Sequence, residues 1–321
     1  MPNPMNLLFV ADSLELFKIQ KDTTFSMMRE AQRRGHRISA CGPEHLLWHS
    51  GDLVRAAVRE IRLTGEPERW FIETGTPLKA LNEFDAVIMR KDPPFDSEYF
   101  YATHLLEHAE REGARVFNKP AALRDHPEKL AILEFARFTT PTLVTRSEAV
   151  VRAFHDLHHD IILKPLDGMG GTGIFRVKRD GLNLGSIIET LNQDGATSLM
   201  VQKFVPEITA GDKRVLVIGG KPVPFSLARI PQGSEVRGNL AAGGLGVAQP
   251  LSARDLAIAE AIGPVLAGRG LLLVGLDVIG ESLTEINVTS PTCFQEITDQ
   301  TGFDVPAMFI DELEAAVGAP A

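Results

Sequence analysis

The chain has 321 residues, of which 44% are hydrophobic and 23% charged, a composition that predicts a globular protein with a sizeable core and two or three domains. Its formal net charge of −9 argues against a nucleic-acid-binding surface, which would carry a basic patch. No apolar run approaches the roughly 20 residues that span a bilayer, no signal-peptide pattern is present, and Cys41 and Cys293 lie far apart, so we expect a cytoplasmic protein with reduced thiols and no membrane partner.

Short apolar runs and helical patterns alternate along the first 118 residues. The apolar runs cover residues 6–12, 37–40, 84–89 and 115–117, and the helical patterns cover residues 23–34 and 98–112. Because strands alternate with helices in proteins that contain a parallel sheet, we predict a small α/β domain over residues 1–118. Its ligands are expected at the carboxyl ends of the strands.

Two cations directly follow one of these predicted strands. Arg90 and Lys91 come after the run 84–89, and Pro93 and Pro94 stiffen the loop that follows. We expect this loop to receive a carboxylate of a substrate. The alternative is an ordinary solvated loop.

A lysine-bearing apolar run leads into a glycine-rich loop within residues 160–177. Gly168, Gly170 and Gly173 have the spacing G-x-G-x-x-G, but residues 174–177 alternate apolar and polar, which predicts a second strand and not the helix of a dinucleotide-binding fold. No G-K-[ST] follows, which excludes a P-loop. Glycine lets backbone N–H groups approach phosphate oxygens closely, and Lys164 in an apolar strand needs an anion to offset its burial. We predict a phosphate-binding hairpin, with an ordinary glycine-rich turn as the alternative.

This hairpin lies in a predicted second domain, residues 119–205. Helical patterns cover residues 127–134, 147–159 and 184–191, and the apolar run 199–205 ends at Pro206. Because proline ends the pairing of the strand, backbone groups remain free there, and we expect them to pair with the edge of an adenine ring.

Residues 206–321 form the third predicted domain. Strand patterns cover residues 212–218 and 222–230, and a helical pattern covers residues 253–269. Between them, residues 230–245 are rich in glycine and show neither the hydrophobic period of a helix nor that of a strand. Long irregular segments inside compact domains are often lids, so we expect a mobile lid here.

Two late apolar strands carry a cluster of oxygen ligands. The strands cover residues 271–279 and 283–288. A three-residue loop between them places Asp277 opposite Glu285 and Gly275 opposite Asn287, whereas a two-residue turn would break that register. Because opposed carboxylates destabilise a sheet, we expect a divalent cation between them. Magnesium fits, since it takes one or two carboxylates together with substrate phosphates. The alternative, a solvated edge hairpin, agrees poorly with the apolar flanking residues.

Five motifs occur together in this chain. They are M-R-K-D-P-P-F-D at 89–96, I-I-L-K-P-L-D-G-M-G-G at 161–171, L-A-R-I-P-Q-G at 227–233, R-G-N-L-A-A-G-G at 237–244 and L-T-E-I-N-V-T-S-P-T at 283–292. As a set they resemble bacterial glutathione synthetases of the ATP-grasp superfamily, from about residue 6 to residue 317. The resemblance implies an ATP-grasp fold preceded by a small parallel-sheet α/β domain. It also implies that ATP phosphorylates the C-terminal carboxylate of γ-glutamylcysteine, after which the amine of glycine displaces phosphate to give glutathione.

The resemblance further implies roles for individual residues. ATP would be bound by Lys129, Lys164, Gly168, Gly170, Gly171 and Gly173 at its phosphates, by Gln202, Lys203, Phe204 and Val205 at the adenine, and by Asp212 at the ribose. Two magnesium ions, or manganese, would be held by Asp277, Glu285 and Asn287, and the charge of phosphate and acyl oxyanion would be stabilised by Arg214, Arg229 and Arg237. The peptide substrate would be bound by Arg90, Lys91, Arg229, Thr289 and Ser290. Lys129 rests on the resemblance alone, because most helical lysines are simply solvated.

Two other functions stay open at this point. One is a different ATP-grasp ligase that joins other amino acids or peptides. The other is a nucleotide sensor without catalysis, against which the intact set Asp277, Glu285 and Asn287 argues, because a sensor need not keep both metal positions. The resemblance suggests a homotetramer, and this chain has Leu245 where the family commonly has a basic residue.

Overall fold

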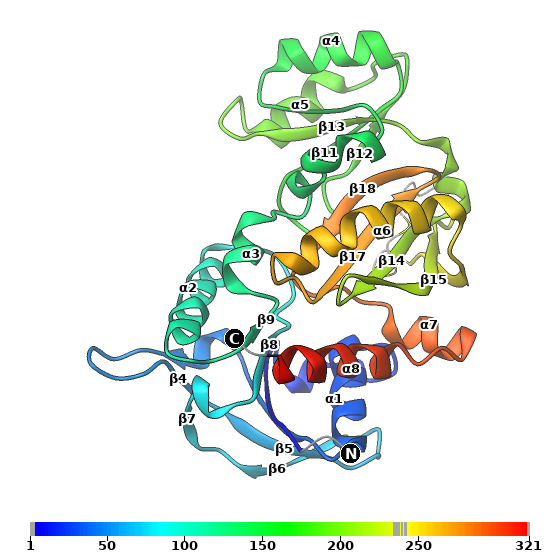
Figure 1. Cartoon of the computed structure of the whole chain (residues 1–321). Coiled ribbons are helices and arrows are strands. Elements are labelled where there is room, and N and C mark those ends of the chain that lie inside the picture. Colours follow the sequence, from blue (N-terminus) through cyan, green and yellow to red (C-terminus); the bar gives the residue numbers. More distant parts are fainter. Residues whose placement is uncertain (1–3, 234–237, 239, 241–242, 320–321) are drawn as a thin grey trace.

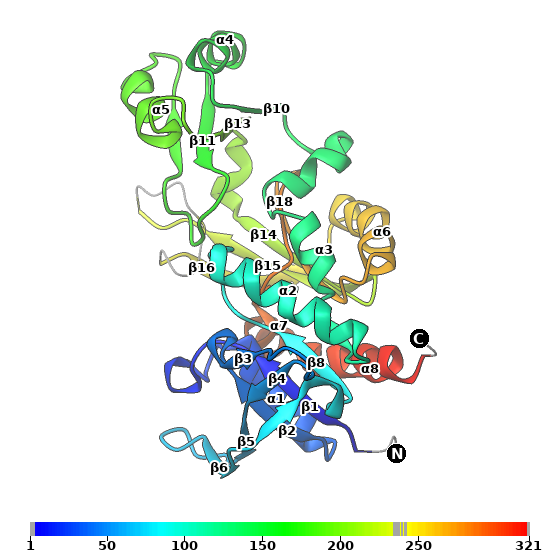
Figure 2. The same cartoon turned by 90° about the vertical axis from the view of Figure 1, so that its left-hand side faces the viewer.

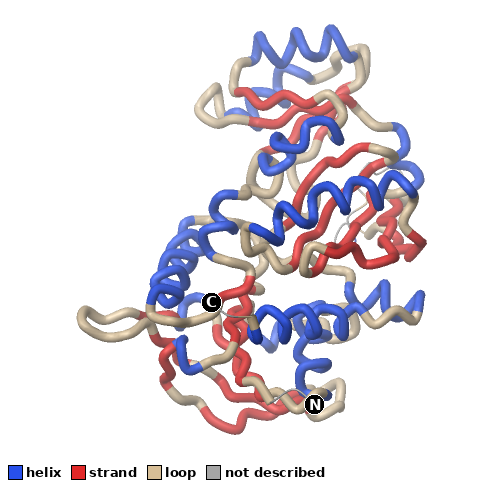
Figure 3. Tube along the Cα trace, in the orientation of Figure 1, coloured by secondary structure: helices blue, strands red, loops and turns tan. Residues whose placement is uncertain are grey.

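The computed structural model describes residues 4–233, 238, 240 and 243–319. Figure 1 shows an elongated molecule in three parts, with the N-terminal strands at one end, a five-stranded sheet in the middle and a four-stranded sheet at the other end. The strands of the three parts follow one another along the molecule in Figure 3. No helix among the described residues is long and apolar enough to cross a membrane.

The N-terminal part is built on a six-stranded sheet of order β6-β5-β2-β1-β8-β9. Its strands are β1 (Asn6–Val10), β2 (Arg37–Cys41), β5 (Arg59–Leu63), β6 (Phe71–Gly75), β8 (Ala86–Met89) and β9 (Val116–Phe117). The pairs β2–β1, β1–β8 and β8–β9 are parallel, as predicted, whereas β5 and β6 are antiparallel additions. The predicted parallel sheet is therefore confirmed, and the structure adds two antiparallel strands at one of its edges.

Helices cover this sheet, and a small second sheet lies beside it. The helices are α1 (Thr23–Arg33), α2 (Ser97–Arg111) and α3 (Pro120–Asp125), and the second sheet consists of β3 (Leu46–Leu47), β4 (Arg55–Ala57) and β7 (Leu78–Ala80). An aspartate caps each long helix: the Asp22 carboxylate accepts a hydrogen bond from the Phe25 amide, and the Asp96 carboxylate accepts one from the Tyr99 amide.

The four-stranded sheet has the order β10-β13-β11-β12 and is antiparallel throughout. It consists of β10 (Thr142–Thr145), β11 (Ile161–Pro165), β12 (Phe175–Val177) and β13 (Leu199–Lys203), with helices α4 (Glu148–His158) and α5 (Leu184–Asn192) packed on it. Its core is separate from the rest of the molecule and includes Val151, Ile161, Leu163 and Ile188. The predicted glycine-rich hairpin connects β11 to β12.

The five-stranded sheet has the order β16-β15-β14-β17-β18 and is antiparallel. It consists of β14 (Asp212–Ile218), β15 (Lys221–Ile230), β16 (Leu245–Pro250), β17 (Leu273–Ile279) and β18 (Ser282–Asn287), and helix α6 (Ala253–Gly268) lies alongside it in Figure 2. Leu245 pairs with Ile230 and Gly246 with Arg229. Ile230 thus ends a strand that was predicted, whereas Leu245, at the other end of the predicted lid, begins β16, which was not predicted.

The chain returns to its N-terminal part through α7 (Phe294–Thr301) and α8 (Val305–Gly318). Helix α8 lies beside α1 in Figure 1, and Arg34 forms ion pairs with Asp311 at 2.6 Å and Glu314 at 3.3 Å. The remaining helices are 3₁₀ segments: Leu14–Leu16, Pro43–His45, Leu81–Glu83, Leu130–Phe138 and Pro206–Ala210. The helix predicted over residues 127–134 is therefore 3₁₀ and begins later, with a kink at Phe135.

Candidate active site

A cavity of about 310 Å³ is lined by residues of the four-stranded and five-stranded sheets and their loops, by Glu128 and Lys129, and by Asp92 and Pro93 of the N-terminal part. Most residues singled out from the sequence line it: Lys129, Lys164, Gly168, Gly170, Gly171, Gln202, Lys203, Phe204, Val205, Asp212, Arg214, Arg229, Asp277, Glu285, Asn287, Thr289 and Ser290. Gly173, Arg90 and Lys91 are not part of this lining. Arg237 lies outside the described residues.

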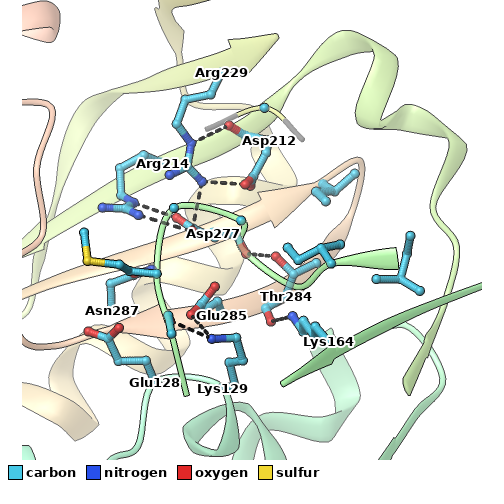
Figure 4. A pocket seen from close by; sticks show the side chains of 18 of the residues that line it. Glu128, Lys129, Lys164, Asp212, Arg214, Arg229, Asp277, Thr284, Glu285 and Asn287 are labelled. Atoms are coloured by element: carbon cyan, nitrogen blue, oxygen red, sulfur yellow. Dashed lines mark hydrogen bonds and ion pairs between the residues drawn. The ribbon is translucent and has the colours of Figure 1, made fainter. Parts of the chain in front are cut away.

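Lys164 and Lys129, two of the three lysines that line this cavity, come from different parts of the chain. Lys164 on β11 is buried, and its Nζ donates to the Thr284 carbonyl at 3.2 Å. The Lys129 Nζ donates to the Gly168 carbonyl at 3.2 Å and lies 3.5 Å from the Glu285 carboxylate (Figure 4). Burial lowers the pKa of Lys164, against the opposing influence of Glu285. An anionic ligand would offset that burial.

The glycine-rich loop depends on conformations that other residues rarely adopt. Gly168, Gly170, Gly171 and Gly173 all have left-handed φ, between 65° and 88°. A Cβ at Gly168 or Gly170 would meet no atom within 4 Å, so backbone conformation and not space demands glycine there. At Gly173 a Cβ would also approach Pro165 to 3.2 Å.

The β17–β18 hairpin has the predicted partners but a different turn. Asp277 lies opposite Glu285 and Gly275 opposite Asn287, as expected. However, Ile279 pairs with Ser282, so the turn contains two residues, and an irregularity next to Asp277 restores the register. Thr284 occupies the extra position, and its hydroxyl donates to the Asp277 carbonyl at 3.1 Å. The prediction of a three-residue loop is therefore wrong, although the side chains still share a face.

Two arginines contact the Asp277 carboxylate, which also lies opposite Glu285 in the hairpin. The Arg214 Nε lies 2.6 Å from its Oδ1, and the Arg229 Nη2 lies 2.9 Å from its Oδ2 (Figure 4). Burial raises the pKa of Asp277, but the two guanidinium groups outweigh burial and hold the pKa well below its usual range. Asp277 is therefore ionised, and the arginines, together with Lys129 beside Glu285, already offset the repulsion that the sequence argument assigned to a metal alone.

Asp212 shares one of these arginines. Its Oδ2 lies 2.6 Å from the Arg229 Nη2, whereas its buried Oδ1 has no hydrogen-bond partner among the residues that the structure describes. Burial raises the pKa of Asp212 to about 6, although Arg229 acts in the opposite direction. A buried oxygen without a partner costs free energy unless a ligand donates to it, so Asp212 is suited to a ligand hydroxyl.

A divalent cation fits the oxygen atoms at this end of the cavity. The Asn287 Nδ2 donates to the Gly275 carbonyl at 3.2 Å, which leaves its amide oxygen available, and Glu285 offers a carboxylate. Asp277 accepts three contacts from arginines, fewer than the roughly four lone-pair positions of a carboxylate. Within the described ranges, no three His, Cys, Asp or Glu side chains form a metal cluster of their own. Substrate oxygens would therefore complete the coordination, as is usual for magnesium.

The strand end at 202–205 is held by a cation over an aromatic ring. The Arg176 guanidinium lies 3.5 Å from the centre of the Phe204 ring and forms an ion pair with Asp160 at 2.6 Å. The Asp160 carbonyl accepts a hydrogen bond from the Phe204 amide at 2.9 Å. Phe204 is therefore fixed through both its ring and its backbone where it lines the cavity.

Arg90 and Lys91 are occupied by protein partners. Arg90 is buried; its Nε donates to the Thr24 hydroxyl and its Nη2 to the Pro291 carbonyl, each at 3.1 Å. The Lys91 Nζ lies 2.6 Å from the Asp12 carboxylate. Asp92, the next residue, does line the cavity. The structure thus does not bring the two predicted cations to the cavity.

Besides Asp92, sequence reasoning missed a second acidic residue of the cavity, Glu128. Its Oε1 accepts hydrogen bonds from the Val288 amide, the Thr289 amide and the Thr289 hydroxyl at 2.9, 3.1 and 2.8 Å. Burial raises the pKa of Glu128, with a smaller contribution from Glu285. Its position next to Lys129 was the one sequence signal, since the backbone donors lie 160 residues further along the chain.

The chain has an ATP-grasp fold. Solved structures that share it include a D-cycloserine synthetase, with a TM-score of 0.68, 15% identity and coverage of 97% of this chain and 99% of that one. A RimK domain ATP-grasp protein from Sphaerobacter thermophilus has a TM-score of 0.57 and 18% identity. The match covers 95% of this chain and 98% of that one. At these identities the likeness concerns the fold alone.

Sequence comparison identifies the family within that class. The model of the prokaryotic glutathione synthetase N-terminal domain matches residues 5–124, and that of the ATP-grasp domain of the same family matches residues 128–302. A glutathione synthetase of Ralstonia nicotianae is 60% identical over 314 residues, with 98% of this chain and 97% of the relative covered. A glutathione synthetase of Bordetella parapertussis is 58% identical over 319 residues, with 98% of this chain and 100% of the relative covered. The chain belongs to the prokaryotic glutathione synthetase family, and its activity is that of an ATP-dependent ligase, which confirms the resemblance seen in the motifs.

Proposed function

We propose that the protein joins γ-glutamylcysteine to glycine and forms glutathione, ADP and phosphate through an acyl-phosphate of the peptide. The observation that carries the proposal is the convergence, on one cavity, of two lysines, two arginines and the oxygen-bearing hairpin. Phosphoryl and acyl transfer depend on positioning and charge stabilisation more than on a protein nucleophile. The cavity offers those charges.

ATP is the proposed phosphoryl donor. Lys129, Lys164 and the glycines of the 168–173 loop would hold its phosphates, because backbone N–H groups and ammonium groups both favour phosphate oxygens. The adenine would lie against residues 202–205. Asp212 would accept a ribose hydroxyl at its buried Oδ1.

Divalent metal would be held by Asp277, Glu285 and Asn287. Magnesium is the proposed ion and manganese an alternative, both of which accept carboxylate and amide oxygens. When bound, the ions would neutralise phosphate charge. Asp277 would at the same time orient Arg214 and Arg229 toward the cavity.

Arg214 and Arg229 would stabilise the charge of the transferring phosphoryl group and of the acyl oxyanion. We propose the same charge-stabilising role for Arg237 because it begins the motif at residues 237–244. It lies in the proposed lid, residues 230–245, whose described residues Gly238 and Leu240 line the cavity. A lid would exclude water, which otherwise hydrolyses an acyl-phosphate.

The peptide substrate would be bound by Thr289, Ser290 and Arg229. For Arg90 and Lys91 we propose an indirect contribution. Arg90 holds the Pro291 carbonyl, and the Ser290 hydroxyl lies 2.5 Å from the Asp92 carboxylate. These contacts would fix the 289–291 segment against the N-terminal part.

Three further properties are proposed from the family and the sequence. The chain would act as a homotetramer in the cytoplasm. It would divide functionally into a substrate-binding segment, residues 1–118, a central ATP-grasp segment, residues 119–205, and a metal and lid segment, residues 206–321. Analytical ultracentrifugation at micromolar concentration tests the tetramer; a monomer or dimer would reject it.

The experiment that tests the activity is an incubation with ATP, magnesium and γ-glutamylcysteine, with and without glycine. We expect glutathione and a stoichiometric amount of ADP only when both substrates are present. Ligation of a different amine or peptide would indicate another ATP-grasp ligase. Nucleotide binding without product would indicate a sensor.

A further inference from the structure

The Glu128 carboxylate joins two stretches of chain that are 160 residues apart. One of its oxygens, Oε1, accepts all three hydrogen bonds from residues 288–289: two from backbone amides and one from the Thr289 hydroxyl. The Glu128 carbonyl also accepts the Ile286 amide at 3.0 Å. A single residue therefore fixes both the end of β18 and the first residues that follow it.

The segment that Glu128 holds lies between the metal hairpin and the N-terminal part. Val288 and Thr289 are buried and directly follow Asn287. On the other side, Arg90 donates to the Pro291 carbonyl and Ser290 contacts Asp92. The segment is thus fixed from two directions, and Glu128 supplies the contacts nearest the hairpin.

The hydrogen bonds to Glu128 determine the backbone conformation of residues 288–289. An ionised or neutral carboxyl oxygen that accepts three donors satisfies groups that would otherwise be buried without partners, and such groups are costly. Without Glu128, the two amides and the hydroxyl would seek other acceptors. The segment would then change its backbone course, and with it the direction of the Thr289 and Ser290 side chains.

We propose that Glu128 is a positioning residue that sets residues 289–290 for the peptide substrate. This inference rests on the proposed function, in which Thr289 and Ser290 contact γ-glutamylcysteine. Glu128 acts through the segment and not on the reacting atoms. Its effect is therefore expected on affinity for the peptide and not on affinity for ATP.

The test compares Glu128→Ala with Glu128→Gln. The glutamine keeps an Oε1 that can accept the same three donors, whereas alanine removes the acceptor. We expect Glu128→Ala to raise the KM for γ-glutamylcysteine by about tenfold or more, with the KM for ATP within about twofold of wild type. Calorimetric titration of the peptide should show the same loss, and Glu128→Gln should restore wild-type values in both measurements.

Glu112→Ala is the matched control. Glu112 also accepts a backbone hydrogen bond, from the Val54 amide at 2.8 Å, but it is not part of the cavity lining. Its loss should lower the melting temperature without changing either KM. If Glu128→Ala does not fold, Glu128→Asp carries the test, because it withdraws the acceptor by one methylene and should raise the KM for the peptide in the same way.

Two results would overturn the role of Glu128 in an enzyme that ligates. One is a wild-type KM for the peptide in a folded Glu128→Ala or Glu128→Asp variant. The other is a glutamine variant as impaired as the alanine variant, which would mean that the charge itself is required. A wild-type protein that forms no glutathione would instead count against the proposed function.

Discussion

At the scale of single residues, the site consists of charges that compensate one another before any ligand binds. Asp277 lies between Arg214 and Arg229, and Glu285 lies beside Lys129. A buried charge without a partner is costly. The same contacts hold each side chain toward the cavity, so the pairing that stabilises the fold also prepares the site.

Glu285→Gln tests the proposed metal role. It removes one charge and keeps the shape of the side chain, so the fold should remain intact while turnover falls by about a hundredfold or more. The measurement is the rate of glutathione formation during a magnesium titration. Glu281→Gln, on the exposed turn of the same hairpin, is the control and should behave as wild type. More than about half of wild-type activity in Glu285→Gln would contradict the role.

Lys164→Met tests the proposed phosphate contact. The methionine keeps the apolar stem and deletes the charge, so a loss of ATP affinity would report electrostatics and not packing. Because burial lowers the pKa of Lys164 in the free protein, its charge is lost at a lower pH than that of an exposed lysine. As the pH is raised, the ATP affinity of the wild type should therefore fall when Lys164 loses its proton, whereas the variant lacks this decrease. Calorimetry at several pH values would show the difference. Unchanged ATP binding in Lys164→Met would make it an ordinary strand lysine.

At the scale of elements, the hairpin β17–β18 shows what the sequence could and could not predict. The pairs of Asp277 with Glu285 and of Gly275 with Asn287 were predicted by assuming a three-residue loop between the two apolar strands. The turn was predicted wrongly because a three-residue loop and a two-residue turn with an extra residue at Thr284 give the same pairs. Local sequence does not distinguish them.

Gly275→Ala tests the packing of this hairpin against its arginine. A Cβ at Gly275 would approach the Arg214 Cδ to 2.8 Å and the Pro291 Cβ to 3.1 Å. Overpacking of this kind costs about 1 to 3 kcal/mol, and displacement of Arg214 from Asp277 should lower kcat by about tenfold or more. The measurement is steady-state kinetics together with the melting temperature. A wild-type kcat would show that Arg214 adjusts without loss. Gly268→Ala, where an added Cβ meets nothing within 4 Å, is the control.

Other elements were missed because their signals are not local. Strands β5 and β6 carry Arg59, Glu60 and Glu73 and are partly exposed, so they lack an apolar run. Arg90 was predicted to bind a substrate carboxylate. The sequence did not reveal the acceptor that it contacts instead, the Pro291 carbonyl, because that residue is 201 positions away. Residue types and short spacings were enough to predict the glycine-rich loop and the carboxylates of the cavity. Which arginines and lysines can contact a ligand depends on their protein partners, and those partners are distant in sequence.

At the scale of the whole molecule, the cavity lies where three parts of the chain meet. The glycine loop comes from the four-stranded sheet, the metal hairpin from the five-stranded sheet, and Asp92 from the N-terminal part. We propose that residues 230–245 complete the enclosure; residues 234–237, 239, 241 and 242 lie outside the described part of the chain. Enclosure matters because an acyl-phosphate reacts with water as well as with an amine.

Cleavage of the proposed lid tests this enclosure. A protease site introduced near Arg237 and then cut should leave ATP binding intact but lower the amount of glutathione formed per ATP hydrolysed, because water competes as acceptor. The control is the same site in the exposed turn at residues 49–52, away from the cavity. An unchanged ratio and rate after cleavage near Arg237 would identify the segment as a passive surface loop.

The most direct test of the account follows an oxygen atom. γ-Glutamylcysteine labelled with ¹⁸O in its C-terminal carboxylate is incubated with the protein, ATP, magnesium and glycine, and phosphate and peptide are examined by mass spectrometry. If the carboxylate attacks ATP and glycine then displaces phosphate, each glutathione formed is accompanied by one phosphate that carries a single ¹⁸O. Glutathione formed together with unlabelled phosphate, or labelled phosphate without glutathione, would contradict the proposed reaction.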